Sequence, residues 1–313
     1  MPFKRAPQEF SASIKEVVIG VGDNAITLGG ENVLPLYSFD AAIKNSPKVG
    51  IEVSDRGPMT DIPGIADYYK GCDSVAAALA KASEMPGADF VVLSLDSADP
   101  NTEDKSIEDC VALCKEAADA VTKPLVIVGS KNVEKDAQLF NKIAEALDGK
   151  NVLLMSAKED NHKSIAVGAV MAYNQKIGAE SSVDINLAKQ LNVLISQLGV
   201  KGESVVMNLG SAAAGYGFEY VASTIDRVKA AALGQNDAQL QMPVITPVAQ
   251  DTWGVKESVV SEEDFPEWGP QEQRAVDMEI TTASACIAAG SNAVILRHPA
   301  SVLAISEMIA ALM

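Results

Sequence analysis

Short apolar runs alternate with amphipathic segments along most of the chain, and this alternation constrains the fold more than any other feature. The segments between the runs carry apolar residues at helical spacing. Such β–α units pair their strands in parallel, and eight of them fill the chain from about residue 48 onward. The sequence therefore predicts an α/β fold, a (β/α)8 TIM barrel. The expected strands are residues 49–53, 90–95, 124–129, 151–156, 182–185, 204–209, 243–246 and 293–297.

An open doubly wound sheet is the alternative, but it usually has fewer strands and a glycine-rich turn after its first strand. Here that turn reads SDRGPMTD and has one glycine. Helical spacing is clear over residues 107–118, 133–147 and 187–198. Asn132 is a suitable N-cap for the second of these, and a last helix is expected to open at Pro299 behind a capping His298.

The first 46 residues do not follow the β–α pattern. Residues 14–20 and 25–30 flank a GVGDN turn and predict a β-hairpin. We expect residues 1–46 to form an N-terminal extension whose hairpin covers the amino-terminal mouth of the barrel, and residues 47–313 to form the barrel itself.

Composition excludes several classes of function. A formal net charge of −17 argues against binding nucleic acid or an anionic membrane through a broad basic surface. Apolar runs stay short of a membrane span, and the start lacks the apolar stretch of a signal peptide, so a cytoplasmic location is expected. The four cysteines form no CxxC pair, which argues against an iron–sulfur or zinc site on this chain.

In such barrels the functional groups lie on the loops at the carboxyl ends of the strands. Small residues at 211–217 let a backbone approach a bulky partner, and the long loop after the seventh strand carries Trp253 and Trp268, which we expect to be exposed contact residues. Reading past each strand gives the candidate cofactor-binding residues: Asp96, Ser97, Ser130, Asn161, Asn208, Gly210, Gly215, Tyr216, Gly217, Gln250, Trp253 and Arg297.

These groups do not form a recognisable catalytic set. Lys131 and Lys158 could form Schiff bases, but loop lysines are usually solvated. Asp96 and Asp99 could pair as acid and base, although a turn or cap role is commoner. His162 lies in DNHKSI, which is similar to the D-x-H-x-x-G motif of cobalt-ligating histidines but has isoleucine in place of the glycine. We therefore expect no metal ligand on this chain.

Several longer segments carry a family resemblance that covers almost the whole chain. The chain resembles the small subunit of the corrinoid/iron–sulfur protein of the reductive acetyl-CoA pathway, a group that includes the delta subunit of acetyl-CoA decarbonylase/synthase. The segments that carry the resemblance are ITLGGENVLPLYSFD (26–40), PKVGIEVSD (47–55), SAKEDNHKSIAVGAVMAYN (156–174), NLGSAAAGYGFEY (208–220) and AVILRHPASV (293–302).

The resemblance implies a barrel related to pterin-binding methyltransferases, paired with a large subunit that carries a [4Fe–4S] cluster and a corrinoid domain. The corrinoid would lie between that domain and the strand ends of this barrel. Its cobalt would take a methyl group from methyltetrahydrofolate by way of a methyltransferase and pass it to acetyl-CoA synthase. This chain would then be a non-catalytic subunit that shields the corrinoid and has no cluster of its own.

Two enzymatic alternatives remain. A stand-alone pterin-dependent methyltransferase would hold the pterin ring through Asp96, Asp160 and Asn161. A class I aldolase-like barrel would use Lys131 or Lys158. The family does not supply a contact map, so the candidate residues rest on barrel geometry alone.

Overall fold

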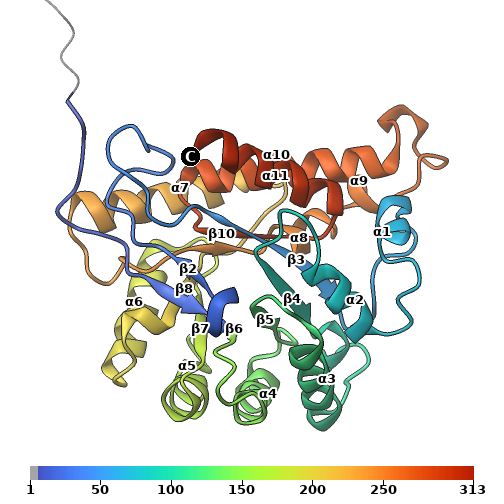
Figure 1. Ribbon diagram of the computed structural model, residues 1–313, viewed down its shortest axis with the longest axis horizontal. Helices are drawn as coiled ribbons and strands as arrows, with labels where there is room; N and C mark the ends of the chain where they lie inside the picture. The colour runs from blue at the N-terminus through green and yellow to red at the C-terminus, as the bar shows by residue number, and fades with distance from the viewer. Residues whose placement is uncertain (1–5) are drawn as a thin grey trace, which may run out of the picture.

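Eight parallel strands form the central sheet of the computed structural model, which describes residues 6–313 (Figure 1). The strand order is β8-β7-β6-β5-β4-β3-β10-β9, and a parallel bridge between Met207 and Val244 joins its two ends. The (β/α)8 barrel is therefore confirmed. The strands are β3 (Lys48–Ser54), β4 (Phe90–Ser94), β5 (Leu125–Val128), β6 (Leu153–Ala157), β7 (Lys176–Glu180), β8 (Val205–Asn208), β9 (Ile245–Thr246) and β10 (Ala293–Leu296).

Helices follow the strands and form the outer layer of the barrel. The helix α5 continues as a π-helix over Ala166–Met171, and α7 does so over Ala230–Gly234. The helices are α1 (Pro63–Tyr68), α2 (Val75–Ser83), α3 (Ile107–Ala120), α4 (Val133–Ala146), α5 (His162–Ile165), α6 (Ile185–Gln197), α7 (Phe218–Lys229), α8 (Val248–Thr252), α9 (Lys256–Val259), α10 (Gln271–Ala289) and α11 (Pro299–Leu312).

Two of the expected caps are present. The Asn132 side chain accepts a hydrogen bond from the backbone N–H of Lys135 and so begins α4. The His298 Nδ1 accepts from the backbone N–H of Ala300 at the start of α11. Both satisfy N–H groups that a helix leaves without a partner in its own first turn.

The expected fifth strand at residues 182–185 is wrong. The strand in that position is β7, which ends at Glu180, and its KIGAE sequence has too few branched apolar residues to predict a strand. The Asp184 side chain accepts hydrogen bonds from the N–H groups of Asn186 and Leu187, so it caps α6 and residue 185 is already helical. The prediction therefore placed the strand in the loop that follows β7.

Successive side chains along each strand point alternately toward the helices and into the barrel, so the strands contribute to two separate apolar layers. In β4, Val91 and Leu93 pack outward beneath the helices, whereas Phe90 and Val92 fill the barrel interior. The neighbouring Gly50 makes room for the Phe90 ring, because a Cβ at Gly50 would lie 2.2 Å from that ring.

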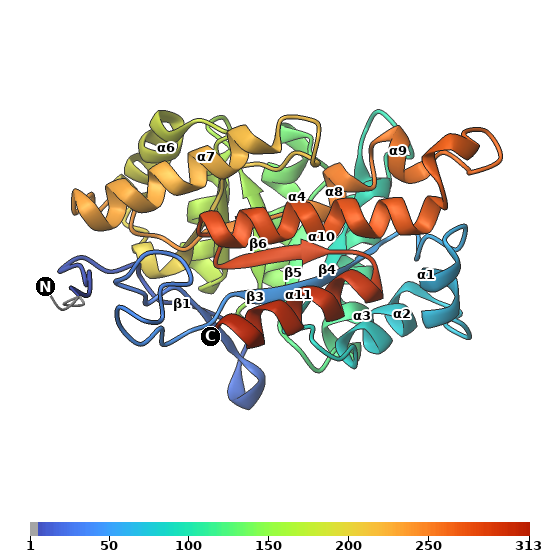
Figure 2. The same cartoon turned by 90° about the horizontal axis from the view of Figure 1, so that it is seen from above.

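The predicted hairpin covers the amino-terminal mouth of the barrel. Strand β1 (Val17–Ile19) pairs antiparallel with β2 (Ile26–Leu28), and both lie outside the barrel sheet. The side chains of Val17, Ile19 and Leu28 join the interior apolar cluster, which closes it against water. Figure 2 places this end opposite α1 and α9. Residues 1–5 of the extension lie outside the described residues.

The long segment between β9 and α10 is partly helical. It contains α8 and α9, and residues 255–269 project from the carboxyl-end rim of the barrel as a lobe (Figures 1 and 2). We call residues 255–269 the rim lobe. Among the described residues, the helices are all too short or too polar to cross a lipid bilayer.

Candidate functional site

A polar pocket of about 320 Å³ opens at the carboxyl ends of the barrel strands. Loops after β5, β6, β7 and β8 form its wall, together with the first turns of α8. This is the end at which barrels of this type place their functional groups. The polar side chains that line it are Lys131, Asp136, Ser156, Lys158, Glu180, Ser182, Asn208, Ser211, Gln250 and Asp251.

The backbone around the pocket is unusually strained. Lys131, Ser182 and Val183 have positive φ angles of 69°, 41° and 64°, in the region that favours glycine. A β-branched residue such as Val183 adopts it at particular cost. Left-handed residues of this kind concentrate at ligand sites, where the surrounding fold holds them in place. The strain therefore indicates that these loops contribute to a ligand site.

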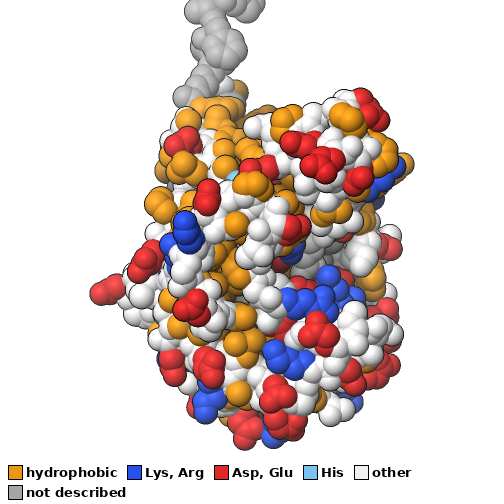
Figure 3. All heavy atoms as spheres, turned by 90° about the vertical axis from the view of Figure 1, so that its right-hand side faces the viewer, with side chains coloured by type: hydrophobic (Ala, Val, Ile, Leu, Met, Phe, Trp, Pro, Cys, Tyr) orange, Lys and Arg blue, Asp and Glu red, His pale blue; other side chains and the backbone are white. Residues whose placement is uncertain are grey.

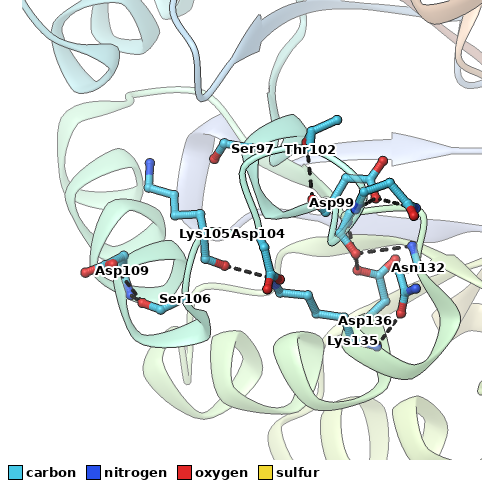
Figure 4. Close-up of polar contacts among 12 residues, drawn as sticks. Ser97, Asp99, Thr102, Asp104, Lys105, Ser106, Asp109, Asn132, Lys135 and Asp136 are labelled. Carbon is cyan, nitrogen blue, oxygen red and sulfur yellow. Dashed lines mark hydrogen bonds and ion pairs between the residues drawn. The ribbon is translucent and has the colours of Figure 1, made fainter.

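Asp136 lies on the wall of the pocket and is almost completely buried. Burial raises the pKa of its carboxyl, and hydrogen bonds from the Ser130 hydroxyl and N–H partly offset this effect. Figure 4 shows Asp136 at the start of α4, where the adjacent Lys135 reaches the loop after β4. The Lys135 Nζ lies 2.7 Å from Asp104 and 2.8 Å from the Lys105 carbonyl, so this loop is fixed to α4.

Charged side chains line the pocket as two lysines, Lys131 and Lys158, and two further carboxylates, Glu180 and Asp251. The Lys158 Nζ lies 3.2 Å from the Glu180 carboxylate. Desolvation raises the pKa of Asp251, while the Ser211 hydroxyl and the charge of Lys131 work in the opposite direction. Figure 3 faces this end of the barrel and shows Lys and Arg side chains gathered near the middle, within a surface that is otherwise rich in acids. The mouth of the pocket thus presents both positively and negatively charged side chains.

Amides supply the neutral part of the lining. The Asn208 Nδ2 donates to the Ser156 hydroxyl at 2.9 Å, and its Oδ1 accepts from the Gly210 N–H at 3.0 Å. The Gln250 Nε2 is buried and has no hydrogen-bond partner within the described chain. A buried amide without a partner is costly, so this group is suited to donate to a bound molecule.

The structure brings Asn208, Gly210 and Gln250 together in the pocket, out of the candidates read from the sequence. Ser97 is buried and donates its N–H and hydroxyl to Asp55. Ser130 is buried against Asp136 in the same way. These two hydroxyls support the loops from within and do not line the pocket.

Asn161 is also internal. Its Oδ1 accepts from the Lys158 N–H, and its Nδ2 donates to the Val133 carbonyl, so it connects the loop after β6 with α4. Asp96, in the loop after β4, accepts hydrogen bonds from the hydroxyls of Ser54 and Ser94, the last residues of β3 and β4. Both residues hold loop geometry and lie outside the pocket wall.

Arg297 lies inside the barrel mouth and forms an ion pair with the buried Glu52. Trp253 corrects an expectation, because it is only 4% exposed and is not a surface contact. Its indole N–H donates to the buried Glu279 at 3.0 Å, and its ring stacks on His298. The Trp253 and His298 side chains therefore belong to the packing beside α10.

The loop of small residues rises next to the pocket. Gly215 and Gly217 have φ angles of 86° and 94°, so their backbone conformation favours glycine. Tyr216 between them is 49% exposed, and its hydroxyl donates to Glu257 of the rim lobe. These candidates lie at the rim and not inside the pocket.

Sequence reasoning missed Asp136, Glu180 and Asp251 as lining residues. Asp136 lies within α4, where a carboxylate normally indicates an exposed or capping position. Glu180 is the last residue of β7, whose position the sequence pattern did not predict. Asp251 lies in α8, within a segment that was expected to be a loop. Correct placement of β7 and α8 would have identified Glu180 and Asp251 as lining residues.

The other chemistries considered earlier find little support in this geometry. Lys158 is ion-paired, and a charged amine is a poor nucleophile. The His162 Nδ1 lies 2.6 Å from the Glu159 carbonyl. Within residues 6–313, no three side chains of His, Cys, Asp or Glu are grouped so that they could hold a metal ion.

Comparison with solved structures supports the fold. The barrel is similar to dihydropteroate synthase from Xanthomonas albilineans with 4-aminobenzoic acid, at a TM-score of 0.58 and 12% identity, over 95% of this chain and 98% of that one. The enzyme from Stenotrophomonas maltophilia gives a TM-score of 0.54 over 85% of this chain and 92% of that one, again at 12% identity. At these identities the likeness concerns the fold alone.

Comparison with curated sequences is more specific. The acetyl-CoA decarbonylase/synthase complex subunit delta of Archaeoglobus fulgidus is 31% identical over 318 residues, which cover 98% of this chain and 70% of that protein. The corresponding subunit of Methanothermobacter thermautotrophicus is 31% identical over 96% of this chain and 76% of its own length. A family model for the CO dehydrogenase/acetyl-CoA synthase delta subunit matches residues 16–304. The chain therefore belongs to the CO dehydrogenase/acetyl-CoA synthase delta subunit family.

Proposed function

We propose that this chain is a non-catalytic subunit of a corrinoid methyl carrier within an acetyl-CoA decarbonylase/synthase complex. Its pocket at the carboxyl ends of the strands would face a corrinoid held mainly by a large corrinoid/iron–sulfur subunit. Methyltetrahydrofolate methyltransferase and acetyl-CoA synthase would be the further partners, in the cytoplasm. Membership of the delta subunit family supports the pathway, and the Gln250 Nε2, which is buried and has no partner within the described residues, is the observation that carries the binding role.

The pocket lining fits a corrinoid. The edge of a corrin ring carries amide side chains, each with a carbonyl that accepts and an NH2 that donates. The Gln250 Nε2, which has no partner of its own within the described residues, would donate to such a carbonyl, and the carboxylates of Asp251 and Glu180, which line the same pocket, would accept from such an NH2. Since the macrocycle itself is too wide for a pocket of about 320 Å³, it would lie across the mouth.

The chemistry of the bound group is methyl transfer at its cobalt. The residues of this chain would orient and protect it. Asn208 and Gln250 would fix the ring edge by hydrogen bonds, and the loop from Gly210 to Gly217 would bring a small-residue wall close to its face. A barrel floor closed by the hairpin side chains Val17, Ile19 and Leu28 would exclude water from the opposite end. Protection of this kind needs no acid, base or nucleophile from the chain.

The test is purification of the complex from its native source with wild-type chain and with Gln250→Leu. The proposal predicts a coloured complex with corrinoid and iron–sulfur absorption, and lower corrinoid content for Gln250→Leu. Gln190→Leu is a matched control, since Gln190 lies on the outer face of α6 and donates to Glu159. Equal corrinoid content in all three complexes, or a chain that purifies alone and without colour, would contradict the proposal.

Pterin binding is a second candidate, and the buried carboxyl of Asp136 together with Asn208 in the same pocket favours it. The three residues first assigned to that role do not support it, because Asp96 and Asn161 have internal partners and Asp160 is exposed outside the pocket. Calorimetric titration of the isolated chain with methyltetrahydrofolate separates the two readings. Binding that Asp136→Asn abolishes, with turnover by the chain alone, would favour the pterin enzyme.

A further inference from the structure

An open groove lies beside the pocket, between the rim lobe and α10. It has a volume of about 540 Å³ and is lined by Ala214, Glu257, Trp268, Arg274, Met278 and their neighbours. Ala214 belongs to the loop that also contributes Ser211 to the pocket. The groove is therefore continuous with the rim at which the pocket opens.

Large apolar side chains are exposed on the two segments that contribute to this groove, namely the loop after β8 with the start of α7, and the rim lobe. Tyr220 is 68% exposed, Tyr216 49%, Val259 40% and Phe265 37%. Aromatic residues of this kind are enriched in the core of protein interfaces and depleted from ordinary surface. Tyr216 and Tyr220 lie on the loop after β8 and the first turn of α7, and Val259 and Phe265 lie on the rim lobe, so both segments beside the groove expose apolar surface and together indicate an interaction surface.

The rim lobe is held in a defined shape. Arg274 of α10 donates to the carbonyls of Glu257, Val260 and Gly269, at distances of 2.6, 2.9 and 3.2 Å. Its guanidinium also lies 5.5 Å from the centroid of Trp268, whose ring stacks on Phe265. A surface that is ordered before binding loses less conformational entropy when a partner arrives.

The charge of the rim lobe specifies its partner. Glu262, Glu263, Asp264 and Glu267 are exposed on it, and Lys256 is its one basic residue. Figure 3 shows acidic and hydrophobic side chains together on this raised part of the face, at its upper right. Opposite charges across an interface accelerate association and exclude wrong partners.

We propose that the rim lobe and its groove dock a basic protein surface, rich in Lys and Arg, on another subunit of the complex. Aromatic side chains would form the apolar centre of this interface, and the acidic side chains would form its rim. This inference rests on the proposed function in one respect, namely that the chain works within a complex. It does not require that the complex binds a corrinoid.

The first experiment is photo-crosslinking within the native complex. A benzoylphenylalanine is placed at Phe265, and at Leu303 on α11 as a control with comparable exposure. Cross-linked peptides are identified by mass spectrometry. We expect the probe at Phe265 to join a Lys- and Arg-rich surface of another subunit. Crosslinks to a second copy of this chain, to an acidic or uncharged surface, or to no subunit at all would overturn the proposal.

The second experiment reverses charge at Glu263 and Glu267, which form no hydrogen bond or ion pair within the described residues. Release of the chain from the complex is followed by gel filtration in increasing NaCl. Glu263→Lys/Glu267→Lys is expected to weaken association roughly tenfold at low salt, with convergence near 1 M NaCl, where charges are screened. Glu116→Lys/Asp148→Lys changes the net charge equally on exposed outer positions and is expected to leave release unchanged.

The two proposals fail separately. A complex without corrinoid whose lobe still crosslinks to a basic subunit would remove the proposed function and leave the docking surface intact. A coloured complex whose release is unaffected by Glu263→Lys/Glu267→Lys, with no crosslink from Phe265, would do the reverse.

Discussion

The Arg297 guanidinium forms an ion pair with Glu52 inside the mouth of the barrel, where the Glu52 side chain is completely buried. Glu52 lies in β3, and Arg297 directly follows β10, which pairs with β3. The charge of Glu52 is the main favourable influence that raises the pKa of Arg297 against the effect of burial. Each charge is therefore tolerated in the interior because the other is present.

Removal of one partner tests this relationship. Arg297→Met leaves the Glu52 carboxylate buried and unpaired, which should lower the free energy of unfolding by about 3–5 kcal/mol. Glu52→Leu/Arg297→Met removes both charges and should recover most of that loss. Urea denaturation followed by circular dichroism measures both variants. A single variant as stable as wild type would show that the pair is not needed to compensate burial.

The small-residue loop offers a test of cofactor contact. Gly217→Val forces a branched side chain into a left-handed conformation, at a cost of about 1–2 kcal/mol. Gly71→Val is the matched control, because Gly71 has a similar φ of 85° and no atom within 4 Å of its added Cβ. We expect comparable losses of stability but reduced corrinoid content only for Gly217→Val. Equal corrinoid content in both complexes would remove this loop from the proposed contact surface.

Glu279 predicts a pH dependence of stability. It is fully buried and accepts hydrogen bonds from Trp253 and from the N–H groups of Arg297 and His298. Burial raises the pKa of Glu279 above its ordinary 4.5, so the folded state binds a proton that the unfolded state has released. The contribution of this group is therefore complete below pH 4.5 and declines as the pH rises through the folded pKa.

Glu279→Gln removes that titration. The variant should be less stable by about 1–3 kcal/mol, since an amide cannot accept all these bonds. The difference from wild type should be larger near pH 4.5 than near pH 7.5, with other titrating groups cancelling in the comparison. Thermal unfolding across this range is the measurement. A difference that grows with pH would mean that the pKa of Glu279 is lowered by its donors.

The rim lobe should depend on Arg274. Arg274→Ala deletes the donors to three lobe carbonyls and the cation over Trp268, so the lobe should open while the barrel remains folded. Cleavage after Glu262 or Glu263 by a glutamate-specific protease should become roughly tenfold faster. Arg274→Lys keeps the charge but lacks the planar guanidinium, so its cleavage rate should lie between those of the wild type and Arg274→Ala. Unchanged cleavage in Arg274→Ala would mean that other contacts fix the lobe.

The sequence alone determined the barrel and its closed floor. Branched apolar runs such as Phe90–Ser94 and amphipathic helices such as α4 carry strong local patterns, and Asn132 and His298 are caps whose chemistry is local. These features depend on neighbours in sequence, so they could be read without a structure. The same holds for the hairpin over the amino-terminal mouth.

Tertiary structure decided what the pocket contains. Ser97 and Asn161 follow strands as expected, yet Asp55 and the Val133 carbonyl engage them from other segments. Trp253 is buried because Glu279 and His298 meet it from α10 and α11. Which polar group is left to face solvent depends on partners distant in sequence, and only the closure of the barrel brings those partners together.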